Sequence, residues 1–486
     1  MTTAGERIVM IFASWRMPRW LTPLALISYI GLLHWTYTSF VAPRFGYLNM
    51  GYRSPDWWGY ALLAAGVVGL GLLHPHRIGK PSDAVAWLHF LMATAPTALI
   101  AQMTPFLPRG LAFRFGVAVE ACWLGVLLLL RWGSRWRADL PAPLARVRNS
   151  VSARLWLAGM LTISLAAGAI SLLLPGVGHR FVSFANVSET RLQYREALAA
   201  VPAVIPYVLL GAVCVTNPAL IAYGWIRQNW WLIGVGIGGQ LLNYSVTGSK
   251  TTAVSLIVAS GLVFLLGRVD VVSGTAFLVT LVGAMLTALA AFLVTGVTAP
   301  AFYFTTRTMV VPGNVAAAHV AYFSKVDPLY WSQAFMSRFV HYPYSESPSY
   351  IIGYFLSGRH DTNANVNLFG DGYESARYAG IALECLVLVG VLLLLDRVSS
   401  HAARRLVLPT VLVPAYLLTN VNVFTALLTS GFALSILVLF FAPLRTSTTI
   451  RTTAPSEKTF TTTDVGDRNV ESRGMAGRRR LVRRRL

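Results

Sequence analysis

Residues 275–299, TAFLVTLVGAMLTALAAFLVTGVTA, carry no charged side chain, and the polar segment Pro300–Tyr378 follows them directly. An apolar run of this length matches the ~20 residues that a helix needs to cross a bilayer. The polar segment begins PAFYFTTRTMV (300–310) and ends NLFGDGYESARY (367–378), and a second apolar run follows it. We therefore expect a large polar loop that is held at one membrane surface between two spanning helices.

The composition of the whole chain is that of a membrane protein. Of its 486 residues, 55% are hydrophobic and only 12% are charged, about half the ~25% charged residues of a soluble domain. The apolar runs predict an all-α polytopic fold with about twelve transmembrane helices and the large loop between helices nine and ten. The predicted spans are Trp20–Phe40, Trp57–Leu73, Ala84–Met103, Leu111–Leu130, Leu155–Leu174, Val201–Tyr223, Trp230–Val246, Thr251–Gly267, Thr275–Ala299, Ala379–Leu395 and two within Leu406–Phe441, with a turn around Asn420–Asn422.

The positive charge predicts an orientation rather than a nucleic-acid partner. The formal net charge is +21, but Lys and Arg lie in short connections between apolar runs and in the C-terminal tail. Under the positive-inside rule these connections face the cytoplasm, so both termini are cytoplasmic and the loop is extracytoplasmic in the inner membrane. The domains are then a transmembrane bundle (1–445), the loop within it (300–378), and a basic, disordered cytoplasmic tail (446–486). The basic connections contain Arg77 and Lys80, Arg131–Arg148, Arg227, Arg268 and Arg397–Arg405.

Several classes of site are absent from the sequence. Cys122, Cys214 and Cys385 each lie in an apolar run without CxxC spacing, which argues against a disulfide framework and a thiolate metal site. The chain has no Walker A loop, dinucleotide fingerprint, HExxH pair or GxSxG elbow. We therefore predict no cofactor and no metal.

Basic residues near the outer surface are candidates for binding an anion. Arg191 and Arg195 are four residues apart and would share one face of a helix. Lys250 follows NYSVTGS (243–249) at the start of the eighth span, where helix N-terminal N–H groups also favour an anion. A phosphate at the membrane surface is the expected ligand. The alternative is ordinary flanking charge that anchors the ends of spans.

The loop adds acids, bases and aromatic rings. In RFVHYPYSESPSY (338–350), Arg338, His341 and Glu346 alternate with tyrosines such as Tyr344. Aromatic faces and carboxylates together suit sugar binding, and His341 or Glu346 is a candidate general base. The alternative is a structured loop with solvated charges. Glu120 and Glu384, inside the fourth and tenth spans, are further functional candidates or simply buried, hydrogen-bonded acids.

Two stretches resemble one known family. VTGSKTTAVSLIVASGLVF (246–264) and NANVNLFGDGYESARYAGI (363–381), separated by the long loop, are similar to the Wzy-type polysaccharide polymerases, which are related to O-antigen ligases and have a GT-C-like architecture. That family commonly has Arg where this chain has Lys250, and its Asn…Asp-Gly-Tyr…Gly pattern resembles the stretch from Asn365 to Gly380. The chain departs from the pattern in that Lys residue and in ARYAG (376–380), where an Asn-Phe-Gly-like run is common.

The resemblance implies a membrane glycosyltransferase of polysaccharide biosynthesis in the cell envelope. It would polymerise oligosaccharide repeat units carried on polyprenyl (undecaprenyl) diphosphate, without a metal, and a chain-length regulator is a candidate partner. An O-antigen-type ligase and a lipid-linked oligosaccharide transporter or flippase are the alternatives. The predicted site comprises Glu346, His341 and Arg338 for catalysis, Arg191, Arg195 and Lys250 for the diphosphate, and Tyr344, Asn365, Asp371, Tyr373 and Arg377 for the glycan. The sugar, the linkage, the acceptor and the oligomeric state stay open.

Overall fold

The computed structural model describes residues 17–135, 140–174, 193–194, 196–198, 200–202, 204–248, 250–268 and 272–443. The chain divides into the units Met1–Arg445 and Thr446–Leu486. The second unit contains the predicted basic tail and lies outside the described residues, as do Arg191 and Arg195. Only the first unit is discussed below.

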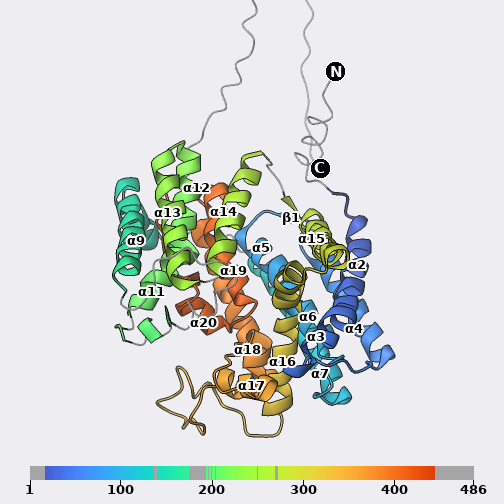
Figure 1. The fold of residues 1–486 in the computed structure, drawn as a ribbon. Helices are drawn as coiled ribbons and strands as arrows, with labels where there is room; N and C mark the ends of the chain where they lie inside the picture. Colours follow the sequence, from blue (N-terminus) through green and yellow to red (C-terminus); the bar gives the residue numbers. More distant parts are fainter. Residues whose placement is uncertain are drawn as a thin grey trace, which may run out of the picture. The chain divides into compact units, whose positions relative to one another are not determined.

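The described part of the chain is almost entirely helical (Figure 1). The N-terminal elements are α2 Leu21–Trp35, η1 Thr36–Val41, α3 Ala42–Phe45, η2 Gly46–Leu48, α4 Trp57–Leu73, β1 Arg77–Ile78, α5 Pro81–His89, η3 Phe90–Thr94, α6 Ala95–Ile100, α7 Arg109–Gly133, α8 Ala142–Ser150 and α9 Ala153–Leu173. After the gap come α11 Val204–Gly211, η4 Ala212–Thr216, α12 Asn217–Arg227, α13 Trp230–Thr247, α14 Lys250–Arg268, β2 Val272–Ser273, α15 Gly274–Thr295, η5 Ala301–Val310, α16 Val311–Phe323, α17 Pro348–Ser357, α18 Leu368–Ser399, α19 Arg404–Leu418, α20 Val423–Leu428 and α21 Phe432–Phe440.

Seven helices within the described residues are long and apolar enough to cross a membrane. An all-α membrane protein is therefore confirmed, whereas the count of twelve spans stays a prediction. A shorter apolar helix, Trp57–Leu73, has the bounds that the sequence predicted. The seven are Leu21–Leu48, Pro81–Ile100, Arg109–Gly133, Ala153–Leu173, Val204–Arg227, Gly274–Thr295 and Leu368–Ser399.

Local capping explains where several of these helices begin and end. The side chains of Ser152, Asn229 and Ser273 accept hydrogen bonds from backbone N–H groups in the first turns of α9, α13 and α15. Gly248 directly follows α13 and Gly296 directly follows α15, and both are in the left-handed conformation that glycine adopts without strain. The polar and glycine residues between the apolar runs thus set the helix boundaries.

Connections that the charge pattern assigned to one side meet at one end of the bundle. Strand β1 pairs antiparallel with β2, so the connections that follow α4 and α14 lie side by side. Ser82 donates through its hydroxyl to Asp396 (2.6 Å), which ties the start of α5 to the last turns of α18. Arg404, at the start of α19, donates to the Ile78 carbonyl. These contacts define the basic end.

The opposite end contains α17 and the irregular residues 324–347, which belong to the segment 300–378 that we call the insert (Figure 1). Asn49, after the first span, donates to the Phe355 carbonyl of α17 (2.8 Å). The Arg53 backbone N–H donates to the Met103 carbonyl (2.8 Å), joining two further connections at this end. We call it the insert end.

Tryptophans mark both ends of the bundle. Trp57 and Trp58 start α4 at the insert end, and their side chains are 57% and 87% exposed. Trp230 and Trp231 start α13 at the other end, where they are 70% and 85% exposed. Amphipathic indole rings concentrate at the two membrane–water interfaces. The positions of these four residues match a bundle that is embedded in a bilayer.

The sequence had suggested that the segment 300–378 is a single polar loop, but the structure shows helices within it. Its first part, η5 and α16, is helical, and α16 packs against α6 and α18 with most of its residues buried. Gly313 permits this close packing, because a Cβ atom there would lie 2.6 Å from the Pro96 carbonyl oxygen. The insert therefore enters the bundle with α16 and returns to the surface in the irregular residues 324–347.

Helix α18 consists of two limbs. Ala376 (φ −151°, ψ 33°) and Arg377 (φ 55°, ψ −139°) interrupt it, so residues 368–375 fold back against residues 378–399. The limbs touch at two glycines, since a Cβ atom on Gly380 would lie 1.9 Å from the Gly372 oxygen. The long limb corresponds to the predicted tenth span, and the short limb carries the functional side chains described next.

Candidate functional site

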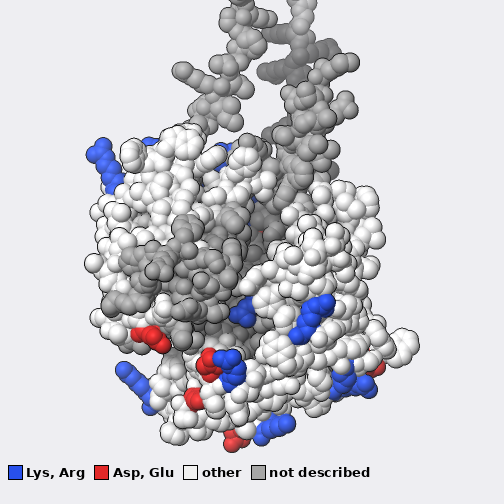
Figure 2. Space-filling view, in the orientation of Figure 1, with Lys and Arg blue, Asp and Glu red and all other residues white. Residues whose placement is uncertain are grey.

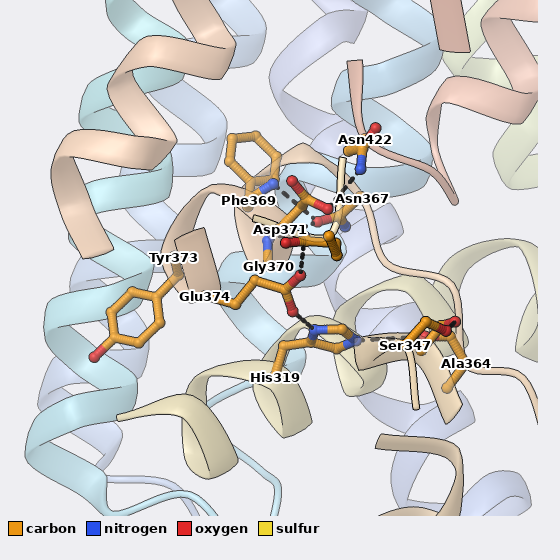
Figure 3. Close-up of polar contacts among 12 residues, drawn as sticks. His319, Ser347, Ala364, Asn367, Phe369, Gly370, Asp371, Tyr373, Glu374 and Asn422 are labelled. Carbon is orange, nitrogen blue, oxygen red and sulfur yellow. Dashed lines mark hydrogen bonds and ion pairs between the residues drawn. The ribbon is translucent and has the colours of Figure 1, made fainter. Parts of the chain in front are cut away.

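A buried acid–base pair links α16 to the short limb of α18 (Figure 3). His319 Nδ1 lies 2.5 Å from Glu374 Oε2, and both side chains are 1% exposed. His319 Nε2 donates to the Ala364 carbonyl oxygen (3.3 Å). Because Nε2 carries a proton, the close Nδ1–Oε2 contact requires a second proton between imidazole and carboxyl. The pair therefore shares this proton, and both side chains are buried.

A turn from the irregular segment covers this pair. The backbone N–H groups of Leu329 and Tyr330 donate to the Glu374 and Ser375 carbonyl oxygens (3.0 and 2.8 Å), which caps the end of the short limb. Gln333 Nε2 donates to the second Glu374 oxygen, Oε1 (3.4 Å). Tyr330 and Trp331 are consecutive residues with φ near 50°, a conformation that is unusual outside glycine. Such strain is found where the surrounding structure enforces it, often at functional sites.

Asn367 fixes the start of the short limb. Its Oδ1 accepts from the Phe369 and Gly370 backbone N–H groups (3.2 and 3.3 Å), which is an N-cap (Figure 3). Its Nδ2 donates to Thr97 Oγ1 (3.0 Å) in α6. The NLFGDGY sequence therefore forms a helix because Asn caps it, and the cap also anchors it to a neighbouring span.

Asp371 and Glu384 lie beside one another, one on each limb of α18. Asn422 Nδ2 donates to Asp371 Oδ1 (2.5 Å), and the Val423 N–H donates to Glu384 Oε2 (3.3 Å). The two carboxyl groups are 4% and 0% exposed. The sequence placed Glu384 inside a span as a functional or hydrogen-bonded acid, and the structure shows it buried and hydrogen-bonded on one oxygen.

An open groove lies at the insert end. It has a volume of about 710 Å³ and is lined by residues at the end of the first span and by the insert. Three tyrosines give it aromatic walls, and Glu346 is the carboxylate in its lining. Its principal lining residues are Tyr47, Asn49, Tyr322, Glu346, Tyr354 and Phe355.

Glu346 belongs to an accessible acid–imidazole pair. Its Oε1 lies 3.4 Å from His360 Nδ1, with side chains 43% and 70% exposed. The His360 ring stacks on Tyr354 at 4.3 Å between centroids. Tyr342 donates through its hydroxyl to the Glu346 carbonyl oxygen (2.6 Å). Burial raises the pKa of Tyr342 and the nearby Glu374 carboxylate raises it further, so the phenol stays protonated as a donor.

Acidic and basic side chains on the visible surface are distributed differently between the basic end and the insert end. In Figure 2 the acidic side chains that can be seen all lie toward the insert end, whereas Lys or Arg is visible at both ends. Between the ends, most of the described surface in this view is uncharged (Figure 2). Arg359 and Asp361 form a solvated pair at the insert end, with Nη2 and Oδ2 2.7 Å apart.

The predicted catalytic residues are only partly brought together. Glu346 lies in the groove, whereas Arg338 and His341 are exposed on the irregular segment and line no part of that groove. The predicted diphosphate residues Arg191 and Arg195 lie outside the described residues. Lys250 begins α14, but its side chain is outside the described part. The anion site stays a prediction.

The predicted glycan residues divide into two groups. Tyr344 is half-buried against Phe323, and Asn365 is exposed. Asp371, Tyr373 and Arg377 share the α18 hairpin.

Arg377 has a structural function in that hairpin. It donates to the Tyr373 carbonyl (3.4 Å) and to the Val326 carbonyl, and its guanidinium lies 5.3 Å from the centre of the Tyr373 ring. These contacts hold the kink, and a glycan role for Arg377 stays a prediction.

Sequence reasoning assigned no role to His319, Glu374, His360, Gln333 or Asn422. His319, Glu374 and His360 all lie in the polar segment 300–378, but no sequence spacing paired them. Asn422 was interpreted only as part of a turn. Among the described residues, no group of three or more His, Cys, Asp or Glu is placed to hold a metal ion, and the three cysteines are free thiols.

Comparison with known proteins adds no relative. No family model, no curated protein and no solved structure matches this chain.

Proposed function

We propose that this protein is a membrane glycosyltransferase that elongates a glycan on polyprenyl-diphosphate-linked repeat units, with its site at the insert end. The observation that carries the proposal is the open groove, whose lining combines three tyrosines with Glu346. Aromatic faces stack on the C–H faces of sugars, while a carboxylate accepts hydrogen bonds from their hydroxyls. A groove of about 710 Å³ falls within the range of ligand sites.

In this proposal Glu346 is the general base. The acceptor hydroxyl loses its proton to the Glu346 carboxylate while its oxygen forms a bond to the anomeric carbon of the donor glycan. The bond from that carbon to the phosphate oxygen breaks, and the electron pair leaves with the diphosphate. A positioned base of this kind contributes typically ~10²–10⁴-fold to the rate. Fixed cations would stabilise the departing charge, and Arg191, Arg195 and Lys250 remain the candidates for that task.

The buried layer beneath the groove would hold Glu346 in place. Tyr342 joins the two layers, because its hydroxyl bonds the Glu346 backbone and lies close enough to Glu374 for that carboxyl group to raise its pKa. His319 and Glu374 already satisfy each other, and Gln333 satisfies the other carboxylate oxygen. In this mechanism they are positioning residues.

The charge distribution supports an extracytoplasmic site. The basic end of the bundle would face the cytoplasm under the positive-inside rule, which puts the groove on the outer face of the inner membrane. A Ser345→Cys variant tests this in whole cells, after any outer envelope has been permeabilised. A membrane-impermeant thiol reagent should label it without lysis. Labelling only after the inner membrane is broken would reverse the orientation and contradict the proposal.

The main experiment compares Glu346→Gln with Asp361→Asn. Glu346→Gln preserves shape but removes the base, so purified protein in vesicles should lose elongation of lipid-linked repeat units by ~10²-fold or more. Asp361→Asn removes an exposed carboxylate from the same end, and it should elongate like wild type. Polymer of normal length and rate from Glu346→Gln would overturn the assignment. In a deletion strain, accumulated single repeat units indicate a polymerase, whereas finished lipid-linked polymer indicates the ligase alternative.

A proton-coupled transporter of lipid-linked oligosaccharide is the second candidate. The observation that favours it is the set of acids buried within the bundle, Asp371, Glu374 and Glu384, because buried acids in membrane spans often relay protons. Reconstituted protein separates the two functions. Movement of the labelled lipid across vesicles that depends on a pH gradient, without any longer glycan, would favour transport.

A further inference from the structure

Two carboxyl oxygens inside the membrane domain have no hydrogen-bond donor. Among the described residues, Asp371 Oδ2 and Glu384 Oε1 are buried and unpartnered. Their side chains are 4% and 0% exposed, so bulk water does not satisfy them. A buried polar atom without a partner carries a substantial free-energy penalty, and native structures rarely retain one. A missing donor is therefore expected at this position.

The other oxygen of each carboxyl is already held by neighbouring residues of one turn. Asn422 donates to Asp371 Oδ1, and the adjacent Val423 N–H donates to Glu384 Oε2. Two consecutive residues thus hold both carboxyl groups at once. This common anchor holds the two carboxyl groups close together, and the two side chains are within hydrogen-bonding reach of one another.

The backbone enforces this closeness. Gly372 follows Asp371, and Gly380 lies one turn before Glu384. The contact between these glycines leaves no room for a Cβ atom on either limb. The acids therefore cannot separate without opening the hairpin.

The surrounding elements supply too little positive charge for two carboxylates. From α16, His319 is engaged with Glu374, which is itself a third acid. Arg377 at the kink bonds backbone carbonyls. The turn places the Trp331 indole near Glu384, but its N–H makes no hydrogen bond. The Cys385 thiol of the long limb is engaged with Cys122, and the 419–422 turn presents the Asn422 amide to Asp371. In the described part of the chain, no Lys or Arg forms an ion pair with Asp371 or Glu384.

We infer that Asp371 and Glu384 bind one proton between Oδ2 and Oε1, forming a carboxyl dyad that joins the two limbs of α18. The proton comes from solvent, and the dyad then carries one negative charge instead of two. A single O–H···O⁻ hydrogen bond satisfies both unpartnered oxygens, and such bonds between acids are short and strong. The two carboxyls titrate as a pair. The dyad is separate from the groove and does not depend on Glu346 acting as a base.

Infrared spectroscopy of the full-length protein in lipid detects this proton directly. The carbonyl stretch of a protonated carboxylic acid is distinct from that of a carboxylate. The difference spectra of wild type minus Asp371→Asn and wild type minus Glu384→Gln should each contain the same protonated-carboxyl band, because each variant removes the shared proton. Wild type minus Glu346→Gln, a solvated carboxylate, should lack that band. Absence of the band from both dyad spectra, or its presence in only one, overturns the sharing.

Thermal stability supplies a second readout. In Glu384→Gln the amide N–H donates to Asp371 Oδ2 and replaces the proton, so the unfolding midpoint should stay close to wild type. Glu384→Ala removes the partner and leaves Asp371 as a lone buried carboxylate, so the midpoint should fall clearly. An equal fall of the unfolding midpoint in Glu384→Gln and Glu384→Ala would contradict the inference, because the amide would then fail to replace the proton.

Discussion

Removing either partner of the buried His319–Glu374 pair should strongly destabilise the fold. Both side chains are 1% exposed, so neither solvent nor salt screens the 2.5 Å contact. His319→Ala leaves Glu374 without its closest partner, and Glu374→Ala does the same to the imidazole. A buried polar group that loses its hydrogen-bond partner costs about 1–3 kcal/mol of unfolding free energy.

The double mutant separates the interaction from the side effects of truncation. Residues that share one buried hydrogen bond have coupling energies of about 0.5–3 kcal/mol. The coupling energy between His319→Ala and Glu374→Ala should therefore be about 2–3 kcal/mol, near the upper end of measured couplings. The assay is reversible unfolding in mixed micelles, followed by tryptophan fluorescence, for wild type, both single variants and the double variant.

The chain offers a matched control for this cycle. Arg359 and Asp361 lie 2.7 Å apart, nearly as close as the buried pair, but their side chains are 72% and 67% exposed. Solvent-exposed ion pairs contribute little to stability, so we expect no measurable coupling energy between Arg359 and Asp361. A coupling between His319 and Glu374 no larger than in the control pair would refute the reasoning that burial strengthens it.

Two further predictions concern the α18 hairpin and the basic end. Gly380→Ala should cost about 1–3 kcal/mol of unfolding free energy, because its Cβ would lie 1.9 Å from the Gly372 oxygen, whereas Gly390→Ala on the same helix meets nothing within 4 Å and should not destabilise. Burial lowers the pKa of His401, so the unfolded chain binds the proton more readily and stability should fall as the pH drops below about 6.5. His401→Gln should reduce that decline, measured as unfolding midpoints across the same pH range, and an unchanged decline would contradict the assignment.

The spanning helices could be predicted because lipid imposes a local requirement. Each span must satisfy its own backbone and expose apolar side chains, and both needs are visible in consecutive residues. The predicted Trp57–Leu73 agrees with α4, and the predicted Leu155–Leu174 differs from α9 by two residues at its start and one at its end. The helix ends follow from caps such as Ser152, which a sequence also shows.

The helix α16 could not be recognised by the same criterion. Residues 309–323, MVVPGNVAAAHVAYF, are apolar but too short for the ~20 residues of a span. The structure shows that this run packs between α6 and α18, where protein rather than lipid covers it. A buried helix of this kind has no minimum length, so a length threshold assigned it to a polar loop.

Long-range pairs in the site had no signal in the sequence. His319 and Glu374 are 55 residues apart, and Asn422 and Asp371 are 51 apart. Their meeting depends on the kink at Arg377 and on contact between two glycines, which no periodicity predicts. Glu346 was easier to single out, because its tyrosine neighbours are adjacent in the chain.

The burial of each acid also indicates whether it can act as the general base. Glu374 has a partner on each oxygen, and it would have to lose His319 or Gln333 before it could accept a substrate proton. Glu346 has one imidazole nearby at 3.4 Å and remains 43% exposed, so a hydroxyl reaches it without breaking the fold. A base must approach the proton that it removes to hydrogen-bond distance. For a bulky glycan on a lipid carrier, only the exposed layer permits that approach, and the buried layer contributes by keeping the irregular segment in place.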